Sequence, residues 1–350
     1  MSASRPHTGV VLINIGTPDS PRVGDVRRYL REFLGDGRVI DLPWFGRKLL
    51  VNGIIVPFRA PKSAKAYEKL WTPQGAPLIV HGTALRDALD DALGDGFRVS
   101  LGMRYRNPAL KSALEEVKAS GVQRIILVPL FPQYASSSTG SALEEAFRII
   151  RGWNDVPQVS TVPPFFREDG YLASFAQRIL ESDPGSFDHV LFSFHGLPNE
   201  HIRRSHTSSL SYLGKSHGAD AVAGCPCETA SYDKHPACYK MQCHSTARAL
   251  AERAGLSAGG WSVGFQSRLN EDWLQPFSDK RIAELAKNGC RNLLVVSPAF
   301  VADCLETVIE IGDEYLELFR HHGGVELKLV ESLNASPSWV QTVADLIKRT

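Results

Sequence analysis

The chain has 350 residues, with 39 basic and 38 acidic side chains and a formal net charge of +1. This length suits two domains or one large one, and 43% hydrophobic residues supply a buried core. A near-zero charge argues against nucleic-acid binding. No apolar run reaches the roughly 18 residues that span a bilayer, and residues 1–9 lack the apolar core of a signal peptide. We therefore expect a cytoplasmic protein.

Short apolar runs typical of buried parallel strands alternate with amphipathic stretches. Turn residues and then helical patterns follow the runs, as βα units require. Residues 107–120, for example, are predicted to form a helix with Pro108 in its first turn. The six clearest runs are residues 10–15, 99–101, 124–128, 190–194, 293–296 and 327–330.

Two pairs of segments match each other across the chain. VVLINIGTP (Val10 to Pro18) parallels HVLFSFHGLP (His189 to Pro198), and residues 124–146 parallel residues 292–311. This order predicts an α/β protein built from two similar doubly wound, Rossmann-like domains with parallel sheets. The alternative is that glycine and proline after a strand are ordinary turn residues.

We expect the first domain at residues 8–160 and the second at 161–350, with a C-terminal helix that packs on the first domain. Ligands of such sheets bind beyond the carboxyl ends of the strands. The site is therefore expected between the two halves.

The second half has polar residues where the first half has less reactive ones. His195 takes the position of Ile15, and Glu306, eight residues after Pro298, takes that of Ser137. A histidine and a carboxylate are thus predicted on neighbouring strand ends. Such a pair can bind a divalent cation such as iron(II), and imidazole can act as a base near neutral pH. A purely structural histidine is the alternative.

Five carboxylates recur at steps of three and four residues: Asp303, Glu306, Glu310, Asp313 and Glu317. This spacing predicts one acidic helical face, whose first members point inward as a path for a cation. A solvated acidic face is the alternative.

The first half contains a candidate surface for an organic ligand. The apolar stretch from Trp44 to Phe58 precedes Arg59, and Arg104 and Tyr105 follow another predicted strand. A large flat ligand with carboxylate tails needs such an apolar wall and cations at its rim. Core residues followed by a basic loop would explain the same pattern.

Four of the six cysteines crowd into 19 residues: Cys225, Cys227, Cys238 and Cys243. In a reducing compartment this crowding favours a four-thiolate metal site over disulfides. A structural zinc and an iron–sulfur cluster both fit the spacing. Cys290 and Cys304 are expected to be buried free thiols.

Six motifs, taken together and in order, make the chain similar to the ferrochelatase family from Val10 to about Ser332. The motifs are LINIGTP (Leu12 to Pro18), GMRYRNP (Gly102 to Pro108), PLFPQYASSSTGS (Pro129 to Ser141), SFHGLP (Ser193 to Pro198), FQSR (Phe265 to Arg268) and PAFVADCLETVIE (Pro298 to Glu310). The resemblance implies a chelatase fold and a lyase of haem biosynthesis. Its reaction would insert ferrous iron into protoporphyrin IX, form haem b and release two protons.

The resemblance also implies residue roles around the metal. His195 matches the family histidine that binds the metal or takes pyrrole protons, and Glu306 matches its partner carboxylate. Glu310 and Asp303 match the carboxylates that form the family's acidic route for the metal. The expected metal contacts are His195, Glu306 and Asp303.

For the porphyrin, the resemblance implies contacts from Arg59, Arg104, Tyr105 and Trp273. Ile15 stands where relatives that use coproporphyrin III carry tyrosine, which favours protoporphyrin. A coproporphyrin III ferrochelatase or a chelatase for another tetrapyrrole is the alternative. A non-enzymatic haem or iron carrier, or a redox module built on the cysteines, would be a different class of protein.

The cysteine segment resembles the internal [2Fe-2S] insertion of some bacterial ferrochelatases. Cys243 also matches a cysteine of relatives that have no cluster, so its role as a ligand is the least supported of the four. The resemblance further implies a homodimer. Because protoporphyrin dissolves poorly in water, residues 44–58 are a candidate for peripheral contact with a membrane surface.

Overall fold

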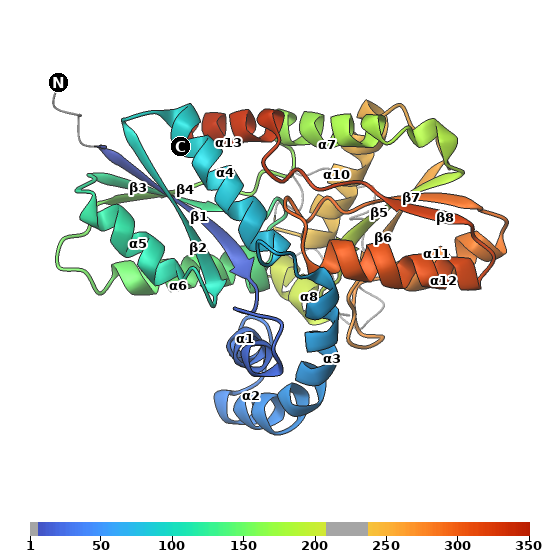
Figure 1. Ribbon diagram of the computed structural model, residues 1–350, viewed down its shortest axis with the longest axis horizontal. Coiled ribbons are helices and arrows are strands. Elements are labelled where there is room, and N and C mark those ends of the chain that lie inside the picture. The colour runs from blue at the N-terminus through green and yellow to red at the C-terminus, as the bar shows by residue number, and fades with distance from the viewer. Residues whose placement is uncertain (1–5, 208–236) are drawn as a thin grey trace. The chain divides into compact units, whose positions relative to one another are not determined.

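The computed structural model describes residues 6–207 and 237–350, which divide into two compact units. The first unit comprises residues 6–131, 135–163 and 334–350, and the second contains residues 132–134 and the described part of 164–333. Each unit has a four-stranded parallel sheet with helices packed around it (Figure 1). The α/β architecture with two similar parallel sheets is therefore confirmed.

The sheet of the first unit has the strand order β2-β1-β3-β4. Its strands are β1 (Thr8–Gly16), β2 (Phe97–Tyr105), β3 (Arg124–Pro129) and β4 (Gln158–Thr161). Along the central strand β1, the side chains of Val10, Val11, Leu12 and Ile13 are all fully buried. An unbroken apolar run of this kind is what a parallel strand covered on both faces requires.

Nine described helical segments of the first unit, and one turn, surround this sheet or extend from its edge. They are α1 (Val23–Gly35), α2 (Trp44–Leu49), η1 (Leu50–Ile55), α3 (Val56–Leu70), α4 (Pro77–Leu93), α5 (Leu110–Ala119), η2 (Ser136–Gly140), α6 (Ser141–Ile150) and α13 (Pro337–Arg349), with η1 and η2 in π-helical conformation, together with the turn at residues 37–39. Helices α5 and α6 pack on one side of β1 with Val11 and Ile13. The last helix of the chain, α13, lies against α4 (Figure 1).

The sheet of the second unit has the order β6-β5-β7-β8. Its strands are β5 (His189–His195), β6 (Trp261–Gln266), β7 (Asn292–Val296) and β8 (Glu326–Leu329). The described helical segments are α7 (Asp169–Glu181), η3 (Pro184–Ser186), α8 (Asn199–Thr207), α10 (Tyr239–Arg253), α11 (Ser278–Lys287), the π-helical η6 (Glu306–Tyr315) and α12 (Leu316–His321). Leu191, Leu293 and Val295 form a core with Ile282 of α11 and Phe319 of α12.

The two sheets share one topology, in which the second strand of each unit precedes the first, third and fourth in spatial order. The matched segments contain β1 and β5 in one pair and β3 and β7 in the other, and each strand occupies the same place in its own sheet. Strands β4 and β6 were not predicted. Strand β4 has only four residues, which is too short for a clear pattern. In β6, Gly264 interrupts the apolar run; the position requires glycine because a Cβ there would lie 2.7 Å from Ser278 Oγ.

The predicted helix at residues 107–120 starts later than expected. Helix α5 begins at Leu110, and Ala109 before it has extended backbone angles. The carbonyl of Pro108 instead accepts a hydrogen bond from the Met103 N–H of β2, at 2.7 Å. Pro108 therefore belongs to a loop that turns back on the strand, and its assignment to the first helical turn was wrong.

Candidate active site

His195 is the last residue of β5, and Gly196 directly after it allows a close backbone approach to β6. The Gly196 N–H donates to the Gln266 carbonyl at 2.8 Å, and a Cβ on Gly196 would lie only 2.8 Å from that same oxygen. Any larger residue would push the two strand ends apart. The glycine of SFHGLP therefore fixes where the histidine leaves the sheet.

The orientation of the His195 ring identifies which nitrogen is available for chemistry. Nδ1 lies 2.6 Å from the Gly196 carbonyl oxygen, and a carbonyl can only accept, so Nδ1 carries the proton. Nε2 then keeps its lone pair in the neutral ring. The rings of Trp273 and Phe300 lie 6.4 and 6.3 Å from the imidazole, centroid to centroid. Nε2 is thus suited to act as a base or as a metal ligand beside aromatic side chains.

Glu310 of η6 is held by donors from three places. Its carboxylate accepts from Gln266 Nε2 at 3.2 Å, from the Ser267 N–H at 2.9 Å and from the Tyr315 hydroxyl at 3.0 Å, and the Ser267 hydroxyl donates to it as well. Burial raises the pKa of Glu310, while the Ser267 hydroxyl and the positive charge that His195 carries when its ring is protonated oppose the rise. Glu310 and His195 therefore form an electrostatically linked pair.

Glu306 begins η6, and its carbonyl accepts from Gln266 Nε2 at 3.0 Å. Its charge adds to the raised pKa of Glu310, so the two carboxylates interact. Strand β7, which leads to this segment, pairs with β5. The prediction that the histidine and the carboxylate would follow neighbouring strands is thereby met.

Asp303 is engaged by residues other than His195 and Glu306. Its carboxylate accepts from the Thr307 hydroxyl at 3.2 Å and from the Ser332 N–H at 3.4 Å. Among residues 6–207 and 237–350, no three His, Cys, Asp or Glu side chains are grouped so that they could hold a metal ion. A ready three-ligand site of His195, Glu306 and Asp303 is not formed in the described structure.

The predicted stripe of five carboxylates is wrong. The segment Glu306–Tyr315 is a π-helix, whose wider turn differs from the α-helical spacing on which the stripe was based. Glu306 and Glu310 still interact, but the five carboxylates differ in burial. Asp303 precedes the helix and is buried, whereas Asp313 and Glu317 are exposed. The solvated-face alternative therefore holds for the last two residues.

Residues outside the predicted set complete the site. Gln266, almost fully buried, donates to the Glu306 carbonyl and the Glu310 carboxylate and accepts from Ser193 Oγ at 2.8 Å. Ser267 adopts a positive φ of 63°, which turns both its N–H and its hydroxyl toward Glu310. The FQSR motif marked this loop by resemblance, but Tyr315 had no signal because its contact depends on the π-helical spacing.

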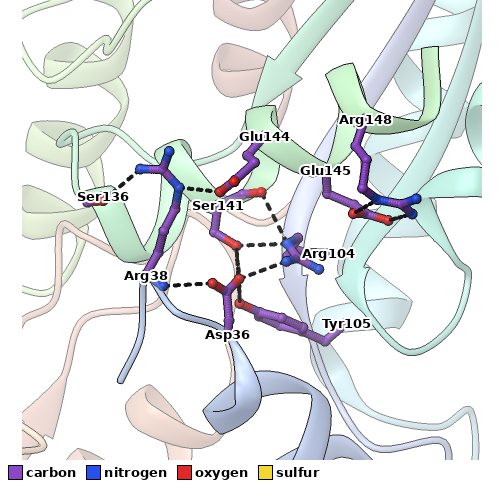
Figure 2. Close-up of polar contacts among 9 residues, drawn as sticks. All are labelled: Asp36, Arg38, Arg104, Tyr105, Ser136, Ser141, Glu144, Glu145 and Arg148. Atoms are coloured by element: carbon purple, nitrogen blue, oxygen red, sulfur yellow. Dashed lines mark hydrogen bonds and ion pairs between the residues drawn. The ribbon is translucent and has the colours of Figure 1, made fainter. Parts of the chain in front are cut away.

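In the first unit, Arg104 and Tyr105 are part of a buried polar network around Asp36 (Figure 2). Oδ2 of Asp36 accepts from Arg104 Nη2 at 2.7 Å, from the Tyr105 hydroxyl at 2.8 Å and from Ser141 Oγ. Burial would raise the pKa of Asp36, but these donors and the charge of Arg104 hold it below its usual value. The network joins the end of α1 to the ends of β2 and the start of α6.

The network continues outward through Arg38, whose backbone N–H donates to Asp36 Oδ1 at 2.8 Å. Its guanidinium donates to Ser136 Oγ at 2.9 Å and pairs with Glu144 (Figure 2). Sequence reasoning did not single out Asp36 or Arg38. Their partners lie far along the chain, so no local spacing could have found them.

The remaining first-unit residues lie on different elements. Ile15 is half-buried near the end of β1, and its N–H donates to Asn14 Oδ1 at 2.7 Å. Arg59 is exposed on α3. Large apolar side chains on α2, η1 and the start of α3 are also exposed: Trp44 (64%), Phe45 (73%), Leu49 (65%), Ile54 (57%) and Phe58 (78%). The alternative that residues 44–58 are mainly core therefore does not hold.

Two of the four clustered cysteines, Cys238 and Cys243, lie on described residues, whereas Cys225 and Cys227 lie outside them. Both described thiols are buried. Cys238 is the N-cap of α10, and its Sγ accepts from the Met241 N–H at 3.5 Å. Cys290 and Cys304 are free and buried, as expected.

Among solved structures, SirB from Bacillus subtilis with Fe3+ resembles this chain with a TM-score of 0.51 at 10% identity. The likeness covers 98% of this chain and 94% of that one. At this identity it shows the fold alone. The protein is thus an α/β protein of that two-sheet fold, with a histidine and two carboxylates after neighbouring strands of its second sheet.

Sequence comparisons identify the family. The family model described as Ferrochelatase matches residues 7–350. A ferrochelatase of Coxiella burnetii (strain Dugway 5J108-111) is 40% identical, over 98% of this chain and 93% of the relative. A ferrochelatase of Pseudomonas paraeruginosa (strain DSM 24068 / PA7) is 43% identical over 97% of each chain, and one of Legionella pneumophila (strain Lens) is 39% identical over 97% and 98%.

The chain belongs to the ferrochelatase family. It is an enzyme, a lyase of haem biosynthesis that inserts ferrous iron into a porphyrin. No described helix is both long enough and apolar enough to cross a membrane.

Proposed function

We propose that the porphyrin is protoporphyrin IX and that His195, Glu306 and Glu310 carry out the insertion. The observation that supports these roles best is the His195 ring, in which Nδ1 donates to the Gly196 carbonyl and Nε2 keeps its lone pair. The linked carboxylates of Glu306 and Glu310 supply negative charge beside it. A base can accept the protons that leave the porphyrin, and carboxylates can bind a ferrous ion.

Insertion replaces two pyrrole N–H protons with one ferrous ion, so the products are haem b and two protons. In the proposed reaction, Nε2 of His195 accepts a pyrrole proton. Glu310, whose pKa is raised by burial, is suited to take a proton and pass it on. Glu306 is the proposed iron contact, with His195 as the alternative contact, because the one free lone pair of Nε2 cannot hold iron and a proton at once. Asp303, which is engaged by Thr307 and Ser332, is a further proposed member of the acidic route and a proposed metal contact.

Porphyrin choice is tested by turnover with two substrates. The purified chain, ferrous iron and either protoporphyrin IX or coproporphyrin III are mixed without oxygen, and the porphyrin bands are followed as they convert. We expect a higher kcat/KM for protoporphyrin IX, because Ile15 and the exposed apolar side chains of α2 and α3 suit an apolar macrocycle. A preference for coproporphyrin III would reverse the assignment. Binding of both porphyrins without turnover would favour a carrier.

In the first unit, we assign Arg59, Arg104 and Tyr105 to the porphyrin, with Trp273 of the second unit as a further pocket residue. Arg59 is exposed and can meet a propionate directly. Arg104 and Tyr105 already donate hydrogen bonds to Asp36, so we assign them to shaping the porphyrin pocket rather than to direct contact with a propionate. Arg59→Ala should raise the KM for protoporphyrin more than it lowers kcat.

We further propose that the four clustered cysteines hold a [2Fe-2S] cluster, with zinc as the alternative. The described pair lies in a setting that can hold a soft metal: both thiols are buried, which raises their pKa, and a backbone N–H in the first turn of α10 points at Cys238 Sγ and opposes that rise. The cluster would bind through Cys225, Cys227, Cys238 and Cys243. Iron, sulfide and zinc analysis of anaerobically purified protein separates the two metals, and Cys225→Ser should abolish the visible absorption of a cluster.

We propose a cytoplasmic enzyme whose segment 44–58 touches the membrane surface. The exposed aromatic side chains Trp44, Phe45 and Phe58 support this contact. In flotation with phosphatidylcholine vesicles, Phe45→Ser and Phe58→Ser together should reduce binding, whereas Phe147→Ser, an exposed phenylalanine on α6, should not. Equal flotation of all variants would count against the contact. Sedimentation of the full chain tests the expected homodimer.

A further inference from the structure

Tyr239 connects the helix that carries two cysteines to the backbone of His195. It is the first residue of α10, directly after Cys238, and its side chain is 6% exposed. Its hydroxyl donates to the His195 carbonyl oxygen at 2.9 Å. The first turn of α10 thus contacts the peptide group of the histidine proposed as the base.

The backbone around His195 is held at three points. The Gly196 N–H donates to the Gln266 carbonyl at 2.8 Å, and the His195 ring donates from Nδ1 to the Gly196 carbonyl at 2.6 Å. The Tyr239 hydroxyl is the third. Removing it leaves the His195 carbonyl without this donor in a partly buried setting, where losing a hydrogen-bond partner has a cost. The peptide group would rotate toward another partner, and the ring attached to it would move.

The same hydroxyl also interacts with Cys243, one helical turn further along α10. Burial raises the pKa of Cys243 and of Tyr239 well above their ordinary values, and each group perturbs the pKa of the other. Cys238 caps the same turn. The turn of α10 that starts directly after Cys238 therefore carries the hydroxyl that holds His195 and leads on to Cys243.

We propose that Tyr239 is a positioning residue that ties the orientation of His195 to the cysteine-bearing first turns of α10. The effect of Tyr239 on turnover rests on the proposed function of His195. The effect of Tyr239 on the conformation of the His195 peptide group is independent of that function.

The first test compares Tyr239→Phe with Tyr171→Phe in the full chain. Tyr171 is a matched control, because its buried hydroxyl also donates to a backbone carbonyl, that of Pro298 at 2.7 Å. One readout is the 15N resonance of Gly196, whose nitrogen shares a peptide group with the His195 carbonyl. The other is the separation of kcat from the KM for protoporphyrin IX.

For Tyr239→Phe we expect the Gly196 resonance to move and kcat to fall at least about tenfold, with KM within about twofold of wild type. Tyr171→Phe should change neither the resonance nor kcat. An unmoved Gly196 resonance in Tyr239→Phe overturns the proposal. If the Gly196 resonance moves but kcat is unchanged, the positioning role of Tyr239 in catalysis is overturned. If the wild-type chain inserts no iron, the proposed function fails, but the Gly196 resonance still shows whether the Tyr239 hydroxyl holds the His195 peptide group.

The link to the cysteines is tested by a double-mutant cycle. Cys243→Ala should move the Gly196 resonance in the wild-type background and leave it unmoved in the Tyr239→Phe background. Movement of equal size in both backgrounds would show that the cysteine acts independently of Tyr239 and would overturn the coupling.

Discussion

At the scale of single residues, buried polar side chains are held by several partners at once. Glu310 is bound by Gln266, Ser267 and Tyr315, and Asp36 by Arg104, Tyr105 and Ser141. The outcome differs between the two carboxylates. At Asp36 the donors and the Arg104 charge outweigh burial and lower the pKa, whereas at Glu310 burial prevails and raises it.

We predict that Asp36→Asn lowers the free energy of unfolding by about 3 kcal/mol at pH 7, since it leaves Arg104 without its buried partner. The lowered pKa gives this effect a pH dependence. The stabilisation from ionised Asp36 is present above the unfolded-state pKa of about 3.9 and is lost as the pH falls through the lower folded-state pKa.

Urea unfolding at pH 7 and at pH 3 measures this difference. The gap between wild type and Asp36→Asn should narrow at the lower pH. Asp95→Asn, on an exposed turn before β2, is the control and should change stability little at either pH. A gap that stays constant would contradict an ionised Asp36 at the centre of the network.

At the scale of elements, strand ends and the first turns after them position the site. Strand β5 ends at His195, β6 ends at Gln266, and η6 begins at Glu306 after β7. Adjacent parallel strands bring these ends to one edge of the second sheet. The turn at Gly196 keeps β5 and β6 close enough for this arrangement.

We predict that Gly196→Ala lowers kcat for iron insertion at least about tenfold, because its Cβ would lie 2.8 Å from the Gln266 carbonyl and displace His195. Steady-state kinetics under anaerobic conditions measure the loss. Gly35→Ala is the matched control, since nothing lies within 4 Å of a Cβ there. Normal turnover by Gly196→Ala would show that the close approach is not needed.

Much of this arrangement was predictable from the sequence, for physical reasons that differ by element. The apolar runs of β1, β5 and β7 are continuous because both faces of their sheets are buried, and the repeat of these runs located His195 and Glu306. Strand β4 is too short to produce such a pattern. The partners of Asp36 and of Tyr239 are distant in sequence and follow only from the packing.

At the scale of the whole molecule, one chain forms two units that share a strand order but carry different polar and apolar side chains. The first unit has the Asp36 network and the exposed apolar side chains of α2 and α3, and the second has His195 with its carboxylates. The chain enters the second unit at residues 132–134 and again from Pro164, and it returns to the first at Asn334. Helix α13 then packs against α4. The last helix in sequence therefore supports the first unit.

We predict that Trp339→Ala, which removes a fully buried side chain of α13, lowers the free energy of unfolding by about 4 kcal/mol. Hydrogen exchange should then accelerate in α4 more than in α11 of the second unit. Trp44→Ala removes an exposed tryptophan and should change stability by less than about 0.5 kcal/mol. Equal loss of protection in α4 and α11 would contradict a local role for α13.

The most direct measurement is anaerobic insertion of ferrous iron into protoporphyrin IX by wild type and His195→Ala, with porphyrin binding followed by fluorescence in the same preparations. We predict that His195→Ala loses at least about a hundredfold in kcat while its porphyrin affinity stays within about threefold. His189→Gln, at the other end of β5, should retain turnover. Insertion by His195→Ala at the wild-type rate would contradict the role of Nε2 on which the proposed chemistry depends.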